Sequence, residues 1–287
     1  MNDSLLICGF GYTAQHLVRR PELTDLQIIG TTRQPQAQTT PAVKYIEFLD
    51  ENIRHHLARS SHVLLCIPPQ ANGADPMFPY RDHLKAAPDI KWIGYLSSTG
   101  IYGDHQGAWV NEQSASINPG VTGTRRLNIE QSWIQFAREH HLPFHVFRLA
   151  GIYGLGRNAL ERILHGKSYS IYKEGHFFSR IHVDDICTAL IASMINPQPG
   201  AIYNLADDEP AAAHEVDSFA CQLLGRTPLP LIPWDTAQLT LREIEFYTHN
   251  RRVENSYIKK SLNIQLRYPS YRDGLLELHR HLELKCS

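Results

Sequence analysis

A short glycine-containing loop near the N-terminus constrains the fold of this chain more than any other feature. The apolar run Leu5 to Cys8 leads into Gly9-Phe10-Gly11-Tyr12-Thr13-Ala14, and a helical pattern follows. Gly9 permits a tight turn, Gly11 lets a ligand approach the backbone, and small Ala14 lets helix and strand pack closely. Such a turn can hold the pyrophosphate of a dinucleotide. The candidate cofactor ligands in the loop are Gly9, Phe10, Gly11, Tyr12 and Thr13.

Short apolar runs alternate with helical patterns along the first half of the chain. The predicted strands are Leu5 to Cys8, Leu26 to Thr31, Tyr45 to Phe48, Val63 to Ile67, Trp92 to Leu96 and Phe144 to Leu149. Apolar residues at helical spacing predict a helix from Arg125 to His141. Strands that alternate with helices imply an α/β fold with a Rossmann-like, doubly wound parallel sheet.

The pattern loosens beyond Gly151, which indicates a second, smaller lobe. Residues 1–150 are predicted to form the dinucleotide-binding domain. Residues 182–206 are predicted to continue it, because they contain a helix around Asp184 to Ile195 and one more sheet strand, Ile202 to Leu205. Residues 151–181 and 207–287 are predicted to form a C-terminal lobe that binds the substrate.

Charge and cysteine usage exclude several classes of function. Lysine and arginine number 28 against 29 acidic residues, so no global field attracts nucleic acid or an anionic membrane. The five cysteines lie far apart without a C-x-x-C motif, which argues against a disulfide framework or a thiolate metal site. The histidines, including His140, His141 and His145, match no known metal-site spacing, and no metal is expected. We expect a cytoplasmic protein that acts on a small molecule, and the sequence leaves a homodimer open.

The end of the second predicted strand indicates which dinucleotide is bound. Folds specific for NAD usually carry a carboxylate there, whereas this chain has Thr31-Thr32-Arg33. A hydroxyl of Thr32 and the guanidinium of Arg33 suit a 2′-phosphate, so NADP is favoured over NAD. The alternative is that Arg33 is a solvated loop residue. Asp50 either contacts the adenine amino group or caps the following helix.

Four motifs together carry a resemblance to a known family. They are Gly9-x-Gly11-x-x-Ala14, Ser97 to Gly103 (SSTGIYG), Arg148 to Gly154 (RLAGIYG) and Arg180 to Asp185 (RIHVDD). Tyr203-Asn204-Leu205 and Tyr268-Pro269-Ser270 with Gly274 extend the likeness to the C-terminal part. The chain resembles the extended short-chain dehydrogenase/reductases, the NAD-dependent epimerase/dehydratase family.

The resemblance implies roles for residues around the second motif. In the family a Ser or Thr before Ile/Val-Tyr-Gly orients the substrate oxygen, and Ser98 stands at the matching position. Tyr102 is a candidate proton donor, with a packing role as its alternative. Arg148 precedes the loop that covers the nicotinamide in relatives, with a structural ion pair as the alternative. Arg180, His182, Asp184 and Asp185 match a segment that borders the substrate pocket, and either aspartate can instead cap a helix.

The chain departs from the family at its Tyr-x-x-x-Lys dyad. Alignment on Pro119, Gly123 and Glu130 places Thr122-Gly-Thr-Arg-Arg126 there. One adjacent cation cannot bring the pKa of a threonine hydroxyl near neutral, and a permanently charged arginine cannot relay a proton. Thr122 and Arg126 are therefore candidate cofactor ligands. This pattern predicts an atypical NADP(H)-binding oxidoreductase-like protein that acts on a small polar metabolite. The alternative is a catalytically inactive nucleotide-sensing or regulatory protein.

Overall fold

The computed structural model describes residues 3–35, 40 and 42–286, which form two compact units. Unit 1 comprises Met1–Ser98, Thr124–Arg148 and Ile186–Tyr203. Unit 2 comprises Thr99–Gly123, Leu149–Asp185 and Asn204–Ser287. Each unit therefore draws on segments that are distant in the sequence.

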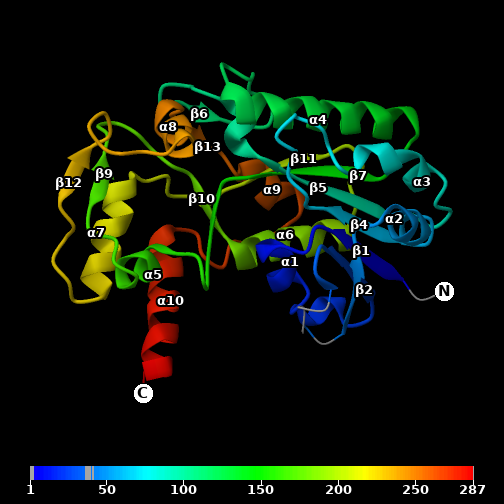
Figure 1. Cartoon of the computed structure of the whole chain (residues 1–287), viewed down its shortest axis with the longest axis horizontal. Helices are drawn as coiled ribbons and strands as arrows, with labels where there is room; N and C mark the ends of the chain where they lie inside the picture. Colours follow the sequence, from blue (N-terminus) through cyan, green and yellow to red (C-terminus); the bar gives the residue numbers. More distant parts are fainter. Residues whose placement is uncertain (1–2, 36–39, 41, 287) are drawn as a thin grey trace. The chain divides into compact units, whose positions relative to one another are not determined.

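A seven-stranded parallel sheet organises unit 1 (Figure 1). Its strands are β1 (Ser4–Cys8), β2 (Gln27–Thr32), β3 (Val43–Glu47), β4 (His62–Leu65), β5 (Trp92–Ser98), β7 (Phe144–Leu149) and β11 (Ile202–Leu205). Their order in the sheet is β11-β7-β5-β4-β1-β2-β3. The predicted α/β class and doubly wound sheet are confirmed. The strand predicted at Ile202 to Leu205 is present at one edge.

The helices of this part of the chain are α1 (Tyr12–Leu17), α2 (Asp50–Leu57), α3 (Arg81–Lys85), α4 (Gly120–Glu139) and α6 (Val183–Ile195). Helix α4 begins five residues before the predicted start at Arg125. Glycine is a poor helix former, so the presence of Gly120 and Gly123 did not indicate a helix, and the first turn of α4 was not predicted. Gly123 fits because the Gly100 carbonyl oxygen and Pro119 lie 2.6 Å from where its Cβ would stand.

The core of unit 1 explains why the central strands read as continuous apolar runs. Every residue of β1 is buried, as expected for a parallel strand covered on both faces. Trp133 of α4 is fully buried and packs edge-on against Phe78 and stacks on Phe144 of β7. These contacts fix α4 against the sheet.

Unit 2 consists of short elements around its own core. Its helices are α5 (Ala159–Leu164), α7 (Ala213–Leu223), α8 (Leu241–Thr248), α9 (Ser256–Ser261) and α10 (Tyr271–Cys286). Its parallel strand pairs are β8 (Gly151–Tyr153) with β10 (Arg180–His182), β9 (Ser170–Tyr172) with β12 (Leu231–Pro233), and β6 (Trp109–Val110) with β13 (Arg252–Val253). Leu160, Val216 and Leu275 lie in the apolar core shared by α5, α7 and α10.

The unit boundaries differ from the predicted domain boundaries. Residues 99–123, 149–150, 182–185 and 204–206 group with unit 2, although they were predicted to belong to the dinucleotide-binding domain. The first difference arises because Trp109 and Val110 pair with Arg252 and Val253, far along the chain. Local patterns do not reveal such a pairing. Substrate binding by unit 2 stays a prediction. Within the described residues, no helix has the length and apolar character needed to cross a bilayer.

Candidate cofactor site and catalytic residues

The glycine loop of unit 1 is held by the end of β2. Gly9 has a φ of 96°, and a Cβ there would lie 2.7 Å from Ile67 Cγ1, so only glycine fits without strain. Its N–H donates to the Thr31 hydroxyl at 2.9 Å, and the Phe10 N–H donates to the Thr31 carbonyl at 3.0 Å. Thr31 therefore shapes the loop. This structural role of Thr31 was not predicted from the sequence.

Gly11 has a different reason to be glycine. Its φ is −98°, which any residue can adopt, and a Cβ would meet no atom within 4 Å. Neither backbone conformation nor packing requires glycine at this position. Tyr12 and Thr13 begin α1 directly after it, where the first N–H groups of a helix have no intrahelical acceptor. Open space beside Gly11 fits the close approach of a phosphate, as the sequence analysis predicts.

Phe10 supports the loop through its ring. The side chain is buried, and a Cβ on Gly30 of β2 would lie 2.5 Å from Phe10 Cδ2. The ring also packs edge-on against Tyr45 of β3, with 4.9 Å between the ring centres. Its N–H is bonded to Thr31, so Phe10 supports the loop by packing, and its contact with a cofactor stays a prediction.

The predicted nucleotide-selecting residues lie where β2 ends. Thr32 is half-buried, and its hydroxyl accepts a hydrogen bond from the Gln34 N–H at 3.3 Å. Arg33 is exposed and directly follows the strand. Both readings of Arg33, a phosphate ligand and a solvated residue, agree with this placement.

Asp50 is the first residue of α2, and Leu49 stands at the N-cap. The predicted alternative, in which Asp50 is the capping residue, is therefore wrong. Its carboxylate accepts from Arg54 Nε at 2.8 Å, one turn later, and its side chain is 61% exposed. Contact with an adenine amino group stays a prediction, in which the amino group would compete with Arg54.

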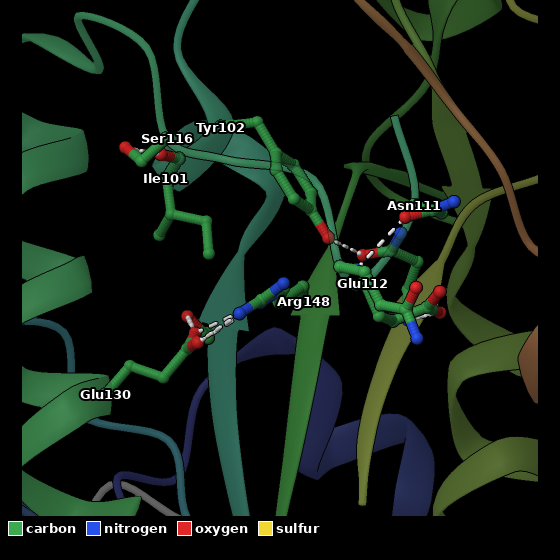
Figure 2. Close-up of polar contacts among 10 residues, drawn as sticks. Ile101, Tyr102, Asn111, Glu112, Ser116, Glu130 and Arg148 are labelled. Carbon is green, nitrogen blue, oxygen red and sulfur yellow. Dashed lines mark hydrogen bonds and ion pairs between the residues drawn. The ribbon is translucent and has the colours of Figure 1, made fainter. Parts of the chain in front are cut away.

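A buried polar network joins β5, α4 and β7 in unit 1 (Figure 2). The Arg148 guanidinium binds Glu130 Oε1 at 2.6 Å, and the Ser97 hydroxyl donates to Glu130 Oε2 at 2.6 Å. The side chains of Glu130 and Arg148 are only 1% and 8% exposed. The alternative reading of Arg148, an ion pair at the strand end, is confirmed. Ser97 and Glu130 were not predicted, because the pairing requires β5, α4 and β7 to be adjacent.

Ser98, the predicted substrate-orienting residue, is the last residue of β5. It is half-buried, while the preceding Ser97 is buried and bonded to Glu130. The network therefore anchors the backbone next to Ser98. The action of Ser98 on a substrate stays a prediction.

Tyr102 lies in unit 2 within a short 3-10 helix, Thr99–Tyr102. Its side chain is 1% exposed, and its hydroxyl donates to Asn204 Oδ1 at 2.7 Å (Figure 2). Asn204 is held in turn, because its backbone N–H donates to Glu112 Oε1 at 2.8 Å. This burial favours the packing role that the sequence analysis named as the alternative. A catalytic role for Tyr102 stays a prediction.

Thr122 and Arg126 lie one turn apart on α4. In unit 2, the backbone N–H and hydroxyl of Thr122 donate to the Glu245 carboxylate of α8 at 3.2 and 2.8 Å. Gly120 makes room for this carboxylate, since a Cβ there would lie 2.6 Å from Glu245 Oε1. No sequence pattern indicated Glu245.

Arg126 belongs to unit 1, where its charge acts on Tyr95 of β5. Burial raises the pKa of the Tyr95 phenol, and the Arg126 guanidinium partly opposes that rise. Arg126 is half-buried, which suits a side chain that reaches a bound phosphate or ribose.

The RIHVDD segment mainly supports unit 2. Asp185 is buried and accepts from the N–H groups of Arg267 at 2.7 Å and Tyr268 at 3.1 Å. Burial raises the pKa of its carboxyl to about 6, against these hydrogen bonds. Helix α6 begins at Val183, so Asp184 and Asp185 lie in its first turn rather than at its cap. In the part of the chain with described positions, no cluster of three His, Cys, Asp or Glu side chains could hold a metal.

The architecture of unit 1 defines the class to which the fold belongs. dTDP-glucose 4,6-dehydratase from Bacillus anthracis, solved in complex with NAD, superposes with a TM-score of 0.77 at 16% identity, covering 98% of this chain and 97% of that one. This protein therefore has the fold of the extended short-chain dehydrogenase/reductases, as the motifs predict. No family model matches the chain.

A nearer relationship exists to a protein from Silicibacter pomeroyi. It is 39% identical, covers 97% of this chain and 99% of that chain, and superposes with a TM-score of 0.90. The chain belongs to the same family as this conserved protein, whose function is unknown.

A second sequence relative is the protein YeeZ of Escherichia coli. It is 30% identical over 142 residues, which is 48% of this chain and 48% of that protein. The match thus spans about half the length of each.

Proposed function

We propose that the protein binds NADP(H) and transfers hydride between this cofactor and a small polar metabolite. The observation that carries the proposal is the Gly9 to Gly11 loop, where Gly11 is required by neither packing nor backbone conformation. A phosphate that approaches this backbone accounts for the glycine. The NAD bound to the Bacillus anthracis relative supports a nicotinamide dinucleotide.

In the proposed function, each group of residues has a separate binding role. The loop from Gly9 to Thr13 binds the pyrophosphate, while Thr32 and Arg33 bind the 2′-phosphate. Arg126 holds the ribose or a phosphate near the nicotinamide, and Ser98 orients the substrate oxygen. The cofactor supplies the hydride chemistry, so the protein chiefly positions the groups that react.

Cofactor preference is the direct test of the 2′-phosphate assignment. NADPH should bind more tightly than NADH by about 1 to 3 kcal/mol, because hydrogen bonds to a charged phosphate contribute that much. Arg33→Ala should remove most of the preference, whereas Arg19→Ala, another exposed arginine of unit 1, should leave it unchanged. Calorimetric titration measures both. Equal affinities in the native protein would refute the assignment.

Ser98 is expected to act on turnover rather than on cofactor affinity. After a metabolite screen for NADPH oxidation identifies a substrate, Ser98→Ala should lower turnover by roughly tenfold to thousandfold, the effect of losing one positioned donor. Arg126→Ala, in contrast, should weaken NADPH binding in addition to lowering turnover. Ser132→Ala, on the exposed face of α4, is the control. Full turnover in Ser98→Ala would assign this residue a structural role.

A second function is favoured by the contacts of Tyr102, the candidate proton donor, and of Thr122, which stands where the family has its catalytic tyrosine. Tyr102 is buried with its hydroxyl on Asn204, and the Thr122 hydroxyl is bonded to Glu245. A protein that binds the dinucleotide and senses it, without turnover, needs neither hydroxyl at a substrate. Tight NADPH binding without hydride transfer to any metabolite in the screen would favour this sensor.

A further inference from the structure

Asp207 is the most unusual polar residue of unit 2. It follows β11 in the chain and is 1% exposed. Both of its carboxylate oxygens are buried, and no described side chain donates a hydrogen bond to either of them; the backbone N–H of Glu209 is a nearby donor and acts to lower the pKa of the carboxyl. Buried polar atoms in folded proteins are nearly always bonded, and an isolated buried charge is strongly disfavoured. Asp207 therefore has a physical reason to keep its proton.

Arg180 of β10 lies beside Asp207 without pairing with it. The Asp207 N–H donates to the Arg180 carbonyl oxygen at 2.6 Å, so the two backbones are adjacent. The Arg180 guanidinium instead donates through one nitrogen to the carbonyl oxygens of Phe178 at 2.8 Å and Ala211 at 2.9 Å. The Arg180 cation thus lies next to the buried Asp207 carboxyl, but its guanidinium is hydrogen-bonded to backbone carbonyl groups.

The other ionisable groups around Asp207 do not supply a counter-charge. Asp208 and Glu209, in the same loop, are paired with Lys259 and Arg272, and their charges oppose ionisation of Asp207. The charge of Asp207 also acts on Tyr153 of β8, and burial raises the pKa of the Tyr153 phenol far above neutral pH. Burial raises the pKa of Asp207 to about 8, while Arg180 acts in the opposite direction.

The carbonyl oxygens that Arg180 binds belong to a small antiparallel bridge. The Phe178 N–H donates to the Ala211 carbonyl at 3.1 Å, and the Ala211 N–H donates to the Phe178 carbonyl at 3.2 Å. Arg180 therefore clamps both strands of this bridge. Near the guanidinium, the Tyr271 ring of α10 lies 6.0 Å away, and the buried Tyr271 hydroxyl has no partner among the described residues.

The bridge is connected to helix α8 through aromatic contacts. The Phe178 ring packs edge-on against Tyr247 of α8, with 5.2 Å between ring centres. His176 packs against both rings, and its imidazole lies 3.2 Å from the Phe246 carbonyl oxygen. Burial lowers the pKa of His176 to about 4, so this residue stays neutral where Asp207 titrates. Helix α8 also carries Glu245, which binds Thr122.

We propose that Asp207 and Arg180 form a proton-operated switch in unit 2. With Asp207 neutral, Arg180 clamps the bridge between Phe178 and Ala211. Loss of the Asp207 proton creates a buried carboxylate, to which the Arg180 guanidinium, a cation whose charge already acts on Asp207, moves. The bridge then loses its clamp, and the support of Phe178 for helix α8 weakens.

The switch itself requires neither cofactor nor substrate. Only its effect on turnover, through α8, Glu245 and Thr122, rests on the proposed function. Experiments on the protein without added ligand therefore test the switch separately. If NADPH binding fails while the switch is observed, only the proposed function is refuted.

Nuclear magnetic resonance of the whole protein can follow both the Asp207 carboxyl and the bridge between Phe178 and Ala211. With Asp207 labelled at Cγ, its carboxyl should titrate with a midpoint near pH 8. The amide signals of Phe178 and Ala211 should shift with the same midpoint. Their protection from hydrogen exchange, corrected for the intrinsic effect of pH, should fall about tenfold above it. In Asp207→Asn, which stays neutral, these amides should remain protected at all pH values in this range.

Asp208→Asn is the matched control, because it removes the neighbouring carboxylate, which is paired with Lys259. The titration of the Phe178 and Ala211 amides should persist in this variant.

Chemical denaturation adds an independent measurement. A folded-state pKa above the unfolded value means that the native protein loses stability as the pH rises from about 4 to about 8. Asp207→Asn should lose less stability over this range, and the loss that remains should end near pH 6, where Asp185 titrates.

Two results would overturn the switch. One is an Asp207 carboxyl in the native protein that titrates below about pH 5, as an ordinary carboxyl does. The other is an unchanged titration of the Phe178 and Ala211 amides in Asp207→Asn. Because the first is measured on the native chain, a variant that fails to fold does not leave the proposal untested.

Discussion

Gly11→Val is expected to abolish dinucleotide binding while the protein remains folded. The valine side chain would occupy the open space beside the loop, where the pyrophosphate must contact the backbone. We expect the affinity for NADPH to fall at least about 100-fold, or ~2.7 kcal/mol. The unfolding free energy should change by only about 1 kcal/mol, since a Cβ at this position meets no atom within 4 Å.

Gly11→Ala provides a graded comparison, because its single methyl group fills less of the same space. Its affinity for NADPH should lie between those of the native protein and Gly11→Val. Fluorescence titration gives the affinities, and thermal unfolding gives the stabilities. Normal NADPH uptake by folded Gly11→Val would show that this loop does not bind the pyrophosphate.

Glu130→Gln is expected to cause a large loss of stability. The substitution leaves the Arg148 guanidinium buried without its counter-charge and weakens the acceptor of the Ser97 hydroxyl. Breaking a buried pair by removing one partner costs about 3 to 5 kcal/mol. Urea denaturation of the purified variant measures the change in unfolding free energy.

Glu139→Gln is the matched control on the same helix. Glu139 is exposed and accepts a hydrogen bond from Gln135 on the same helix, so its replacement should cost less than about 0.5 kcal/mol. Similar losses in the two variants would mean that the buried ion pair does not stabilise α4 against β5 and β7.

The sheet of unit 1 could be predicted because each strand is marked by the residues of its own short segment. Strands β1, β2, β4, β5 and β7 are buried on both faces, so their residues form apolar runs that are visible without any tertiary contact. The glycine loop is equally local, since Gly9 adopts a positive φ and Gly11 leaves open space within one turn. The first turn of α4 was missed because glycine at positions 120 and 123 disguises a helix that tertiary contacts stabilise.

The partners of the candidate site residues could not be predicted in the same way. Ser98 was selected by a motif, yet the anchoring of its neighbour Ser97 to Glu130 depends on the adjacency of β5 and α4. Tyr102 was a candidate proton donor by its position in the motif. Its burial against Asn204, 102 residues later, favours packing instead. Asp207 gave no signal in the sequence, because an aspartate in a loop is usually solvated.

The sequence by itself determined the class of fold, and it predicts a phosphate-binding loop and the replacement of the family dyad by Thr122 and Arg126. Each of these depends on residue type and short-range spacing. Tertiary structure alone decided that Glu245 binds Thr122, that Glu130 neutralises Arg148, and that Asp207 is buried beside Arg180. These pairings join segments that are distant in the chain, and burial sets the energy of a charge only after the chain has folded around it.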